Sequence, residues 1–238
     1  MIQKLITQIS RIVVGALFVF SGFVKLVDPI GSKYKFQEYF SADVLNMEFL
    51  IPYALPFAIL LIVAEILLGV MILIGYKPNF TVWSLFLLTL VFLFLTWYSA
   101  YYNKVTDCGC FGDAIKLSTW ETFYKNVILI ALIIILLMKV KLIKPIFNGK
   151  ITKVITFVSL AGFMFIVQHV LTHLPMIDFR AYAIGKNISE GMEYPEDGSI
   201  PPVHDFMLED AQADLAPELL KKEKVMLVIV YNLDKIDV

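Results

Sequence analysis

Five long apolar stretches constrain the fold of this chain more than any other feature of its sequence. They cover, to within a few residues, positions 6–27, 53–74, 81–101, 123–138 and 154–171. A membrane-spanning helix needs about 20 predominantly apolar residues, because the hydrocarbon core of a bilayer is about 30 Å thick. Charged residues make up 17% of the chain, whereas a soluble domain carries about 25%. The sequence therefore predicts an all-α membrane protein with five spans.

The lysines of the short loops determine the expected orientation of these spans. The loop after the fourth stretch contains no acid and carries Lys139, Lys141, Lys144, Lys150 and Lys153. Because such loops stay in the cytoplasm, we expect a multi-pass protein of the bacterial inner membrane with a cytoplasmic N-terminus. The loop between the third and fourth stretches and the chain after residue 173 are then periplasmic. The formal net charge of −1 gives no indication of a nucleic-acid partner.

The chain has two cysteines, Cys108 and Cys110, which are separated by one glycine on a periplasmic loop. Residues at this spacing lie within reach of a disulfide, and the resulting small ring is strained and easily reduced. Gly109 helps to close the ring, because glycine adopts φ values that other residues avoid. Asp107 and Asp113 disfavour a neighbouring thiolate, and the sequence shows no nearby group that would stabilise one. A redox-active pair is the leading interpretation. The alternatives are a fixed turn with unreactive cysteines or a static disulfide, and a metal site.

Ionisable side chains in or near the spans supply the other candidate site residues. Glu65 lies well inside the second stretch, where a carboxylate needs a partner, and Lys25 at the outer end of the first stretch is the expected one. The pair is either part of a proton or quinone site or a structural ion pair that fixes helix register. His169 and His173 are spaced i, i+4 at the outer end of the fifth stretch. Together with the two cysteines they form a weaker alternative, a tetrahedral metal site.

The composition changes after the fifth stretch. Residues 174–201 resemble a linker, and residues 202–238 predict a small α/β segment. The segment carries Pro-Val-His-Asp-Phe at 202–206 and, further on, a valine-rich strand at 225–231. This order is similar to the start of a thioredoxin-like domain. Where such domains carry Cys-x-x-Cys, this chain has Asn-Leu-Asp-Lys at 232–235. Because a lone strand cannot bury itself, either the natural protein continues beyond this segment, which we favour, or the segment adds to the sheet of another polypeptide.

Several residues of the first half of the chain together form a pattern that is typical of one protein family. They are Arg11, Ser21, Gly22, Lys25 and Leu26 in the first stretch, Glu65 and Gly69 in the second, the segment 108–113, and Trp120 and Asn126 after it. This combination resembles the MauE family, a branch of the DoxX-like membrane proteins, over about residues 1–140. The resemblance implies a four-helix membrane bundle at 1–140, to which a fifth transmembrane helix at 150–173 is added. MauE is associated with disulfide formation in methylamine dehydrogenase beside a thioredoxin-like partner, and DoxX-like relatives with quinone or thiol redox chemistry.

These observations favour one function and leave others open. The leading hypothesis is a thiol–disulfide redox protein whose Cys108 and Cys110 exchange disulfides with an extracytoplasmic thiol or thioredoxin-like protein. A quinone bound near Lys25 and Glu65 is the candidate electron partner, and we expect the protein to contact lipid and to work within a membrane complex. The alternative is a non-enzymatic scaffold or accessory subunit in which the cysteines only shape a loop. A quinol oxidase subunit of the DoxX-like kind is a third interpretation.

Overall fold

All regular elements in the part of the chain that the structure describes are helices. The computed structural model describes residues 2–102, 104–105, 109–112, 114–115, 117–173, 175, 177–180, 183, 185, 187 and 190. The elements are α1 (Ile2–Val27), α2 (Pro29–Phe40), η1 (Glu48–Tyr53), α3 (Ala54–Ile74), α4 (Pro78–Tyr102), α5 (Thr119–Met138), η2 (Val140–Leu142) and α6 (Gly149–Thr172). Five of the helices are long and apolar enough to cross a membrane, namely α1, α3 with η1, α4, α5 and α6. The predicted all-α fold with five spans is therefore confirmed.

The chain divides into two compact units, Met1–Arg180 and Ala181–Val238. Few residues of the second unit belong to the described part of the chain. The predicted α/β segment and most of the predicted linker lie outside it, so their structure stays a prediction.

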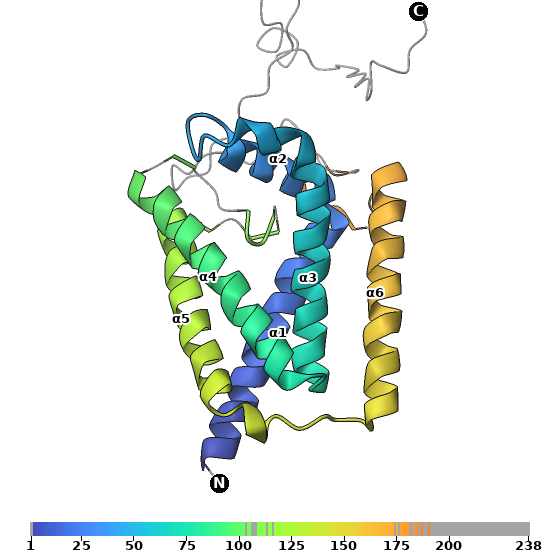
Figure 1. The fold of residues 1–238 in the computed structure, drawn as a ribbon. Coiled ribbons are helices and arrows are strands. Elements are labelled where there is room, and N and C mark those ends of the chain that lie inside the picture. Colours follow the sequence, from blue (N-terminus) through green and yellow to red (C-terminus); the bar gives the residue numbers. More distant parts are fainter. Residues whose placement is uncertain are drawn as a thin grey trace, which may run out of the picture. The chain divides into compact units, whose positions relative to one another are not determined.

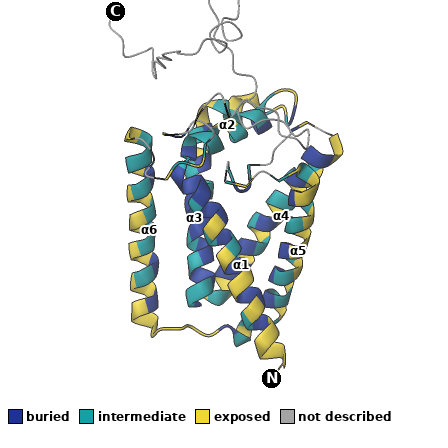
Figure 2. Ribbon diagram, turned by 180° about the vertical axis from the view of Figure 1, so that it is seen from behind, coloured by how far each residue is buried: buried dark blue, intermediate teal, exposed yellow. Residues whose placement is uncertain are grey.

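Helices α1, α3, α4 and α5 form a bundle, and α6 packs on its outside against α3 and α1 (Figure 1). Apolar side chains from all four bundle helices fill the core, with Val14, Ile72, Leu85 and Ile133 fully buried. A second cluster lies between α1, α3 and α6. Only 11% of the most apolar part of α6 is buried within the protein, against 56% for α1, and Figure 2 shows α6 exposed along most of its length. The outer surface of α6 is therefore available to lipid.

Two glycines allow α1 and α3 to approach closely. A Cβ atom added to Gly22 of α1 would lie 2.8 Å from the backbone nitrogen of Ile66 in α3. A Cβ atom added to Gly69 of α3 would lie 2.8 Å from the backbone nitrogen of Val19 in α1. Small residues at such crossings bring helix backbones into van der Waals contact, which is a main source of helix association in lipid.

Arg11 connects the N-terminal half of α1 to the C-terminal end of α3. The last carbonyl groups of a helix have no partner within it, and α3 ends at Gly75 with a left-handed φ of 75°. The buried Arg11 side chain donates hydrogen bonds to the carbonyls of Ile72 (2.8 Å), Leu73 (2.6 Å) and Lys144 (3.1 Å). One side chain of α1 therefore satisfies the end of α3 and fixes the loop that follows α5.

Helix α2 was not predicted from the sequence and lies across the end of the bundle that carries the cysteine loop (Figure 1). Asp28 caps it, because its Oδ1 accepts a hydrogen bond from the backbone N–H of Gly31 at 3.0 Å, and Pro29 occupies the first turn. The Asp-Pro pair is a helix-start signal that the sequence contained. The buried side chains of Tyr39 and Phe40 attach α2 to the helices beneath it.

Helix α5 starts earlier than the apolar stretch from which it was predicted. Ser118 and Glu121 form a capping box, in which each side chain bonds the other residue's backbone N–H. The two residues have the Ser-x-x-Glu spacing that is typical of this motif. The box moves the start of the helix to Thr119 and extends the shortest predicted span to 20 residues.

Candidate functional site

Residues 109–112, the described part of the cysteine segment, form a tight turn beneath α2 (Figure 1). The backbone N–H of Gly112 donates to the carbonyl of Gly109 at 3.2 Å. Both glycines have positive φ, 64° at Gly109 and 49° at Gly112. The expectation that Gly109 adopts a conformation closed to other residues is confirmed. Cys110 is 8% and Phe111 7% exposed, so the turn places its side chains within the bundle.

Cys108 lies outside the described residues. The structure therefore reports the position of one cysteine of the predicted pair, and a disulfide between Cys108 and Cys110 stays a prediction.

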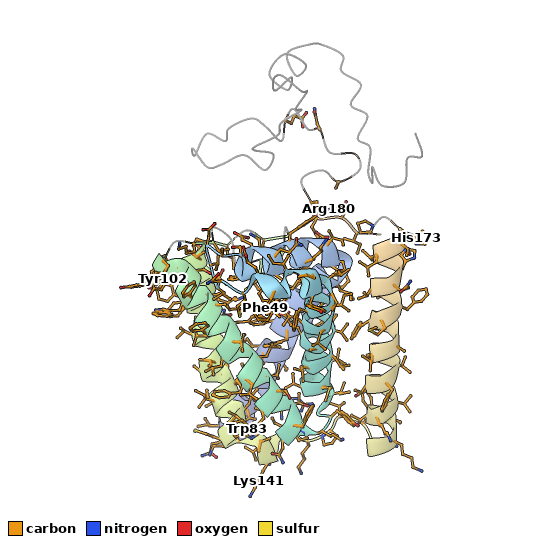
Figure 3. All side chains as sticks on the ribbon, turned by 45° about the horizontal axis from the view of Figure 1, so that its top comes forward. Phe49, Trp83, Tyr102, Lys141, His173 and Arg180 are labelled. Carbon is orange, nitrogen blue, oxygen red and sulfur yellow. The ribbon has the colours of Figure 1, made fainter. Side chains whose placement is uncertain are left out.

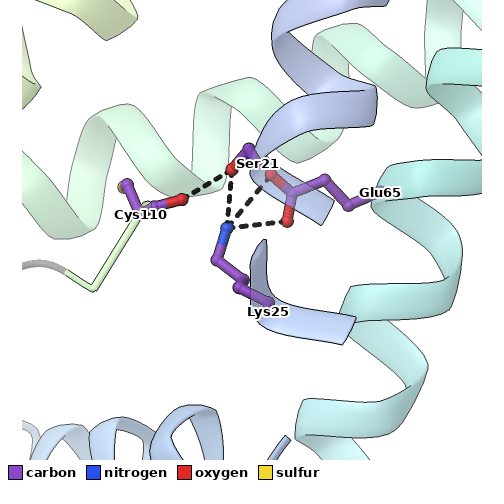
Figure 4. A network of polar contacts seen from close by, with 4 residues as sticks. All are labelled: Ser21, Lys25, Glu65 and Cys110. Carbon is purple, nitrogen blue, oxygen red and sulfur yellow. Dashed lines mark hydrogen bonds and ion pairs between the residues drawn. The ribbon is translucent and has the colours of Figure 1, made fainter. Parts of the chain in front are cut away.

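A chain of polar contacts runs from α3 through α1 to the cysteine turn (Figure 4). The Lys25 Nζ atom lies 2.9 and 3.1 Å from the two carboxylate oxygens of Glu65 and donates to Ser21 Oγ at 2.8 Å. The Ser21 hydroxyl in turn donates to the backbone carbonyl of Cys110 at 2.6 Å. The predicted pairing of Lys25 with Glu65 is confirmed. The sequence did not assign Ser21 a role, although its i, i+4 spacing to Lys25 puts both side chains on one face of α1.

The ion pair at the centre of this network is almost fully buried. Lys25 is 6% and Glu65 3% exposed. A charge this deep needs a partner and further hydrogen bonds, and the network supplies both. In the described part of the chain, every buried side-chain nitrogen and oxygen has a hydrogen-bond partner.

Lysines from three different helices lie around the cysteine turn. Lys125 of α5 places its Nζ atom 4.4 Å from the ring centroid of Phe111. The stem of Lys35 in α2 packs against Gly109, where an added Cβ atom would lie 3.0 Å from its Cγ. Lys25 of α1 completes the set. These lysines were not assigned to the cysteine site from the sequence, because they are distant from it in the chain and only the fold brings them near the turn.

The described residues outline three cavities beside the turn, and the largest of these three has a volume of about 240 Å³. It lies beside Gly109, and its charged lining residues are Lys25, Asp28, Lys35, Asp178 and Arg180. The Arg180 side chain donates hydrogen bonds of 2.8 and 2.6 Å to the carboxylate of Asp178, which hold the pKa of that group below its ordinary value. This cavity therefore combines a mostly apolar lining with several charged side chains, and it lies at the end of the bundle that carries the cysteine turn.

The other two cavities are smaller and contact Cys110 directly. One, of about 60 Å³, is mostly apolar and includes Lys25, Phe36 and Phe92 in its lining. The other, of about 20 Å³, is lined by residues of α1, α3, α4 and α5 and of the turn, including Glu65, Cys110, Lys125 and Asn126. A volume of this size is sufficient for one water molecule.

The predicted quinone site was assigned to Lys25 and Glu65. Lys25 lines two cavities, of about 240 and 60 Å³, and both are smaller than the roughly 300–1,000 Å³ that cofactor and ligand sites occupy. Neither cavity has the volume of such a site in the described arrangement. Coupling to a quinone therefore stays a prediction, and no step below depends on it.

The predicted alternative metal site involved the two histidines of α6. The rings of His169 and His173 stack with their centroids 4.6 Å apart. Among the residues that the structure describes, no three His, Cys, Asp or Glu side chains lie close enough to hold a metal ion. The histidines and Cys110 thus belong to no such group, and Cys108 lies outside the described residues.

Comparison with models of protein families gives a match over more than half of the chain. A family model with the description "Methylamine utilisation protein MauE" matches residues 3–139. Searches of curated proteins and of solved structures found no match. The matched range contains helices α1 to α5, the cysteine turn and the Ser21–Lys25–Glu65 network, and it ends before α6 begins.

Proposed function

Because this chain belongs to the MauE family of multi-pass membrane proteins, we propose that it exchanges disulfides with a partner protein through Cys108 and Cys110. The pair would cycle between disulfide and dithiol. The partner would be a thiol protein outside the cytoplasm, of thioredoxin-like or similar kind. The family description names methylamine utilisation, which we propose as the setting of this exchange, and a quinone is the candidate for the final electron partner.

The reaction requires the cysteine turn to face an oxidising compartment, where disulfides persist. The lysine-rich loop between α5 and α6 supports a cytoplasmic position for that end of the bundle. Figure 3 shows Lys141 and Trp83 at this end, and Phe49, Tyr102, His173 and Arg180 at the other. We therefore propose the inner membrane as the location, with the cysteine turn on the periplasmic side.

The position of Cys110 is the observation that carries the proposal. A cysteine that only fills space in the core does not require a specialised turn or a side-chain hydrogen bond to its carbonyl. Here, two glycines with positive φ shape the turn, and a buried network holds the carbonyl of Cys110. Exchange proceeds by attack of a thiolate in line with the S–S bond, so a catalytic sulfur benefits from a fixed position.

The redox state of the two cysteines in cells tests this function. Cells are quenched in acid, and free thiols are labelled with a maleimide mass tag before and after a short pulse of dithiothreitol. We expect a disulfide that is reduced by the pulse and reforms within minutes. The doubly substituted Cys108→Ser/Cys110→Ser protein should lose this cycle while remaining in the membrane.

Two outcomes would contradict the proposal. Cysteines that stay free throughout, or a disulfide that resists the pulse, would leave the non-enzymatic scaffold as the better interpretation. In that case the double serine variant should retain its partner complexes.

A further inference from the structure

We propose that the lysine-rich end of the helical bundle is a binding surface for anionic phospholipid, with the headgroup at the start of α6 and the acyl chains along exposed apolar side chains of the same helix. This inference goes beyond the proposed function and does not depend on it. It does not depend on the orientation of the protein either, because phospholipid headgroups lie at both surfaces of a bilayer.

The charge at this end of the bundle has one sign. Seven lysines lie there, on α1, the turn between α3 and α4, the end of α5, the following loop and the start of α6, namely Lys4, Lys77, Lys139, Lys141, Lys144, Lys150 and Lys153 (Figure 1). Residues 1–27, 66–106 and 122–177, which contain all of these segments, include no aspartate or glutamate. The ion pairs among the described residues involve none of the seven lysines. Their charge is therefore not neutralised within the described part of the chain.

Hydrogen bonds bring lysines of separate segments together at the end of α3. The backbone N–H of Ile146 donates to the carbonyl of Ile74 at 3.0 Å, and the carbonyl of Lys144 accepts from Arg11 at 3.1 Å. These bonds fix the loop against the end of α3, next to the turn that carries Lys77. The side chains of Lys77 and Lys144 are both exposed, so both ammonium groups are accessible to a headgroup.

Two further lysines lie at the start of α6, where a positive charge does not stabilise a helix. Asn148 caps α6 by accepting a hydrogen bond from the backbone N–H of Ile151 at 3.0 Å, and the exposed Lys150 and Lys153 follow within the first two turns. The N-terminal end of a helix carries a positive partial charge, and like charges at this spacing repel each other. The two lysines therefore weaken their own helix unless an anion lies beside them.

Exposed apolar side chains continue the face of α6 on which Lys150 lies. Val154, Phe157 and Val158 follow Lys150 at i+4, i+7 and i+8, a spacing that puts all four residues on one side of the helix. The three apolar residues are 59%, 58% and 65% exposed. A ligand that matches this face needs an anionic group joined to a long apolar chain. Phospholipid has both, whereas an acidic soluble protein matches only the lysines.

Lipid binding to the full-length protein in detergent tests this inference. Dioleoylphosphatidylglycerol and dioleoylphosphatidylcholine have the same acyl chains and differ in headgroup charge. Each is titrated separately, and the bound lipid is counted by native mass spectrometry. We expect the anionic lipid to bind at least about tenfold more tightly at low salt and to lose most of this preference at high salt, because salt screens exposed charges. Equal affinity for the two lipids at low salt would overturn the inference.

Substitutions at the start of α6 test the position of the site. Lys150→Gln/Lys153→Gln should lower the affinity for phosphatidylglycerol about tenfold, whereas Lys150→Arg/Lys153→Arg should retain it. Lys33→Gln/Lys104→Gln is the matched control, because it removes the same charge from the opposite end of the bundle, where α2 lies and α4 ends. The control should bind like the wild-type protein. If both glutamine variants lose affinity equally, net charge alone explains the preference and the site is refuted.

A second variant keeps the inference testable if the glutamine protein is unstable. Lys77→Gln/Lys144→Gln changes the neighbouring part of the same surface and leaves α6 intact, and it should also lower the affinity for phosphatidylglycerol. An unchanged affinity in this variant would contradict a surface that includes the end of α3.

Two competitors identify the class of ligand. Glycerol 3-phosphate carries the anionic group without acyl chains, and polyglutamate represents an acidic protein segment. Neither should displace phosphatidylglycerol at millimolar concentration, because neither reaches the apolar face of α6. Displacement by glycerol 3-phosphate would show a site for simple anions, and displacement by polyglutamate would show a site for an acidic protein. Either result would replace the lipid site proposed for this surface.

Discussion

Lys25 and Glu65 neutralise each other at a site where both side chains are almost fully buried. Replacing Lys25 by methionine leaves Glu65 buried without a cation and removes a hydrogen bond to Ser21. We expect the free energy of unfolding to fall by about 3–5 kcal/mol, the usual effect of breaking a buried pair. Lys25→Met/Glu65→Leu should recover much of the loss, because it removes both charges. Unfolding in mixed micelles measures both effects, and equal stability of the single and double variants would contradict this account.

At the residue scale, the sequence predicted the residues whose burial is energetically costly, such as Glu65, and those with reactive side chains, such as the cysteines. A carboxylate within an apolar helix requires a partner, and Lys25 was within reach of Glu65 on geometric grounds. Lys125 was not predicted beside the cysteines, because its proximity depends on how α5 packs next to an inward-folded turn. Ser21 was likewise assigned no role, since a serine in a membrane helix usually bonds its own backbone.

The crossing of α1 and α3 depends on the absence of side chains at Gly22 and Gly69. An alanine at Gly22 would place its Cβ atom 2.8 Å from the Ile66 backbone nitrogen, and a backbone cannot move aside as a flexible side chain can. We expect Gly22→Ala to destabilise the protein by about 1–3 kcal/mol, as overpacking of a close contact does. The measurement is the same micelle unfolding assay.

Gly162→Ala in α6 is the matched control for this prediction. Nothing lies within 4 Å of a Cβ atom added there, so the change should be neutral or slightly stabilising through helix propensity. Comparable destabilisation by the two variants would show that the effect of Gly22→Ala comes from something other than the crossing.

At the scale of elements, the long helices were predictable and the short one was not. A run of about 20 apolar residues has few structural alternatives, so all five spans were found, with the helix starts displaced by a few residues. Helix α2 has no such run, because polar and apolar residues alternate irregularly along it. Its Asp-Pro cap was a local signal, but its position over the cysteine turn follows from packing of Tyr39 and Phe40.

The membrane orientation of the whole molecule decides whether the cysteine turn can work as proposed. In a Cys108→Ser/Cys110→Ser background, single cysteines are introduced by Lys141→Cys at the lysine-rich end and Phe49→Cys, a position 73% exposed, at the other. In spheroplasts, a membrane-impermeant maleimide should label Phe49→Cys at once and Lys141→Cys only after permeabilisation, because lysine-rich loops stay inside. Labelling of both positions after permeabilisation is the control. The reverse pattern would put the turn in the reducing cytoplasm, where a disulfide would not persist, and would exclude exchange with a periplasmic partner.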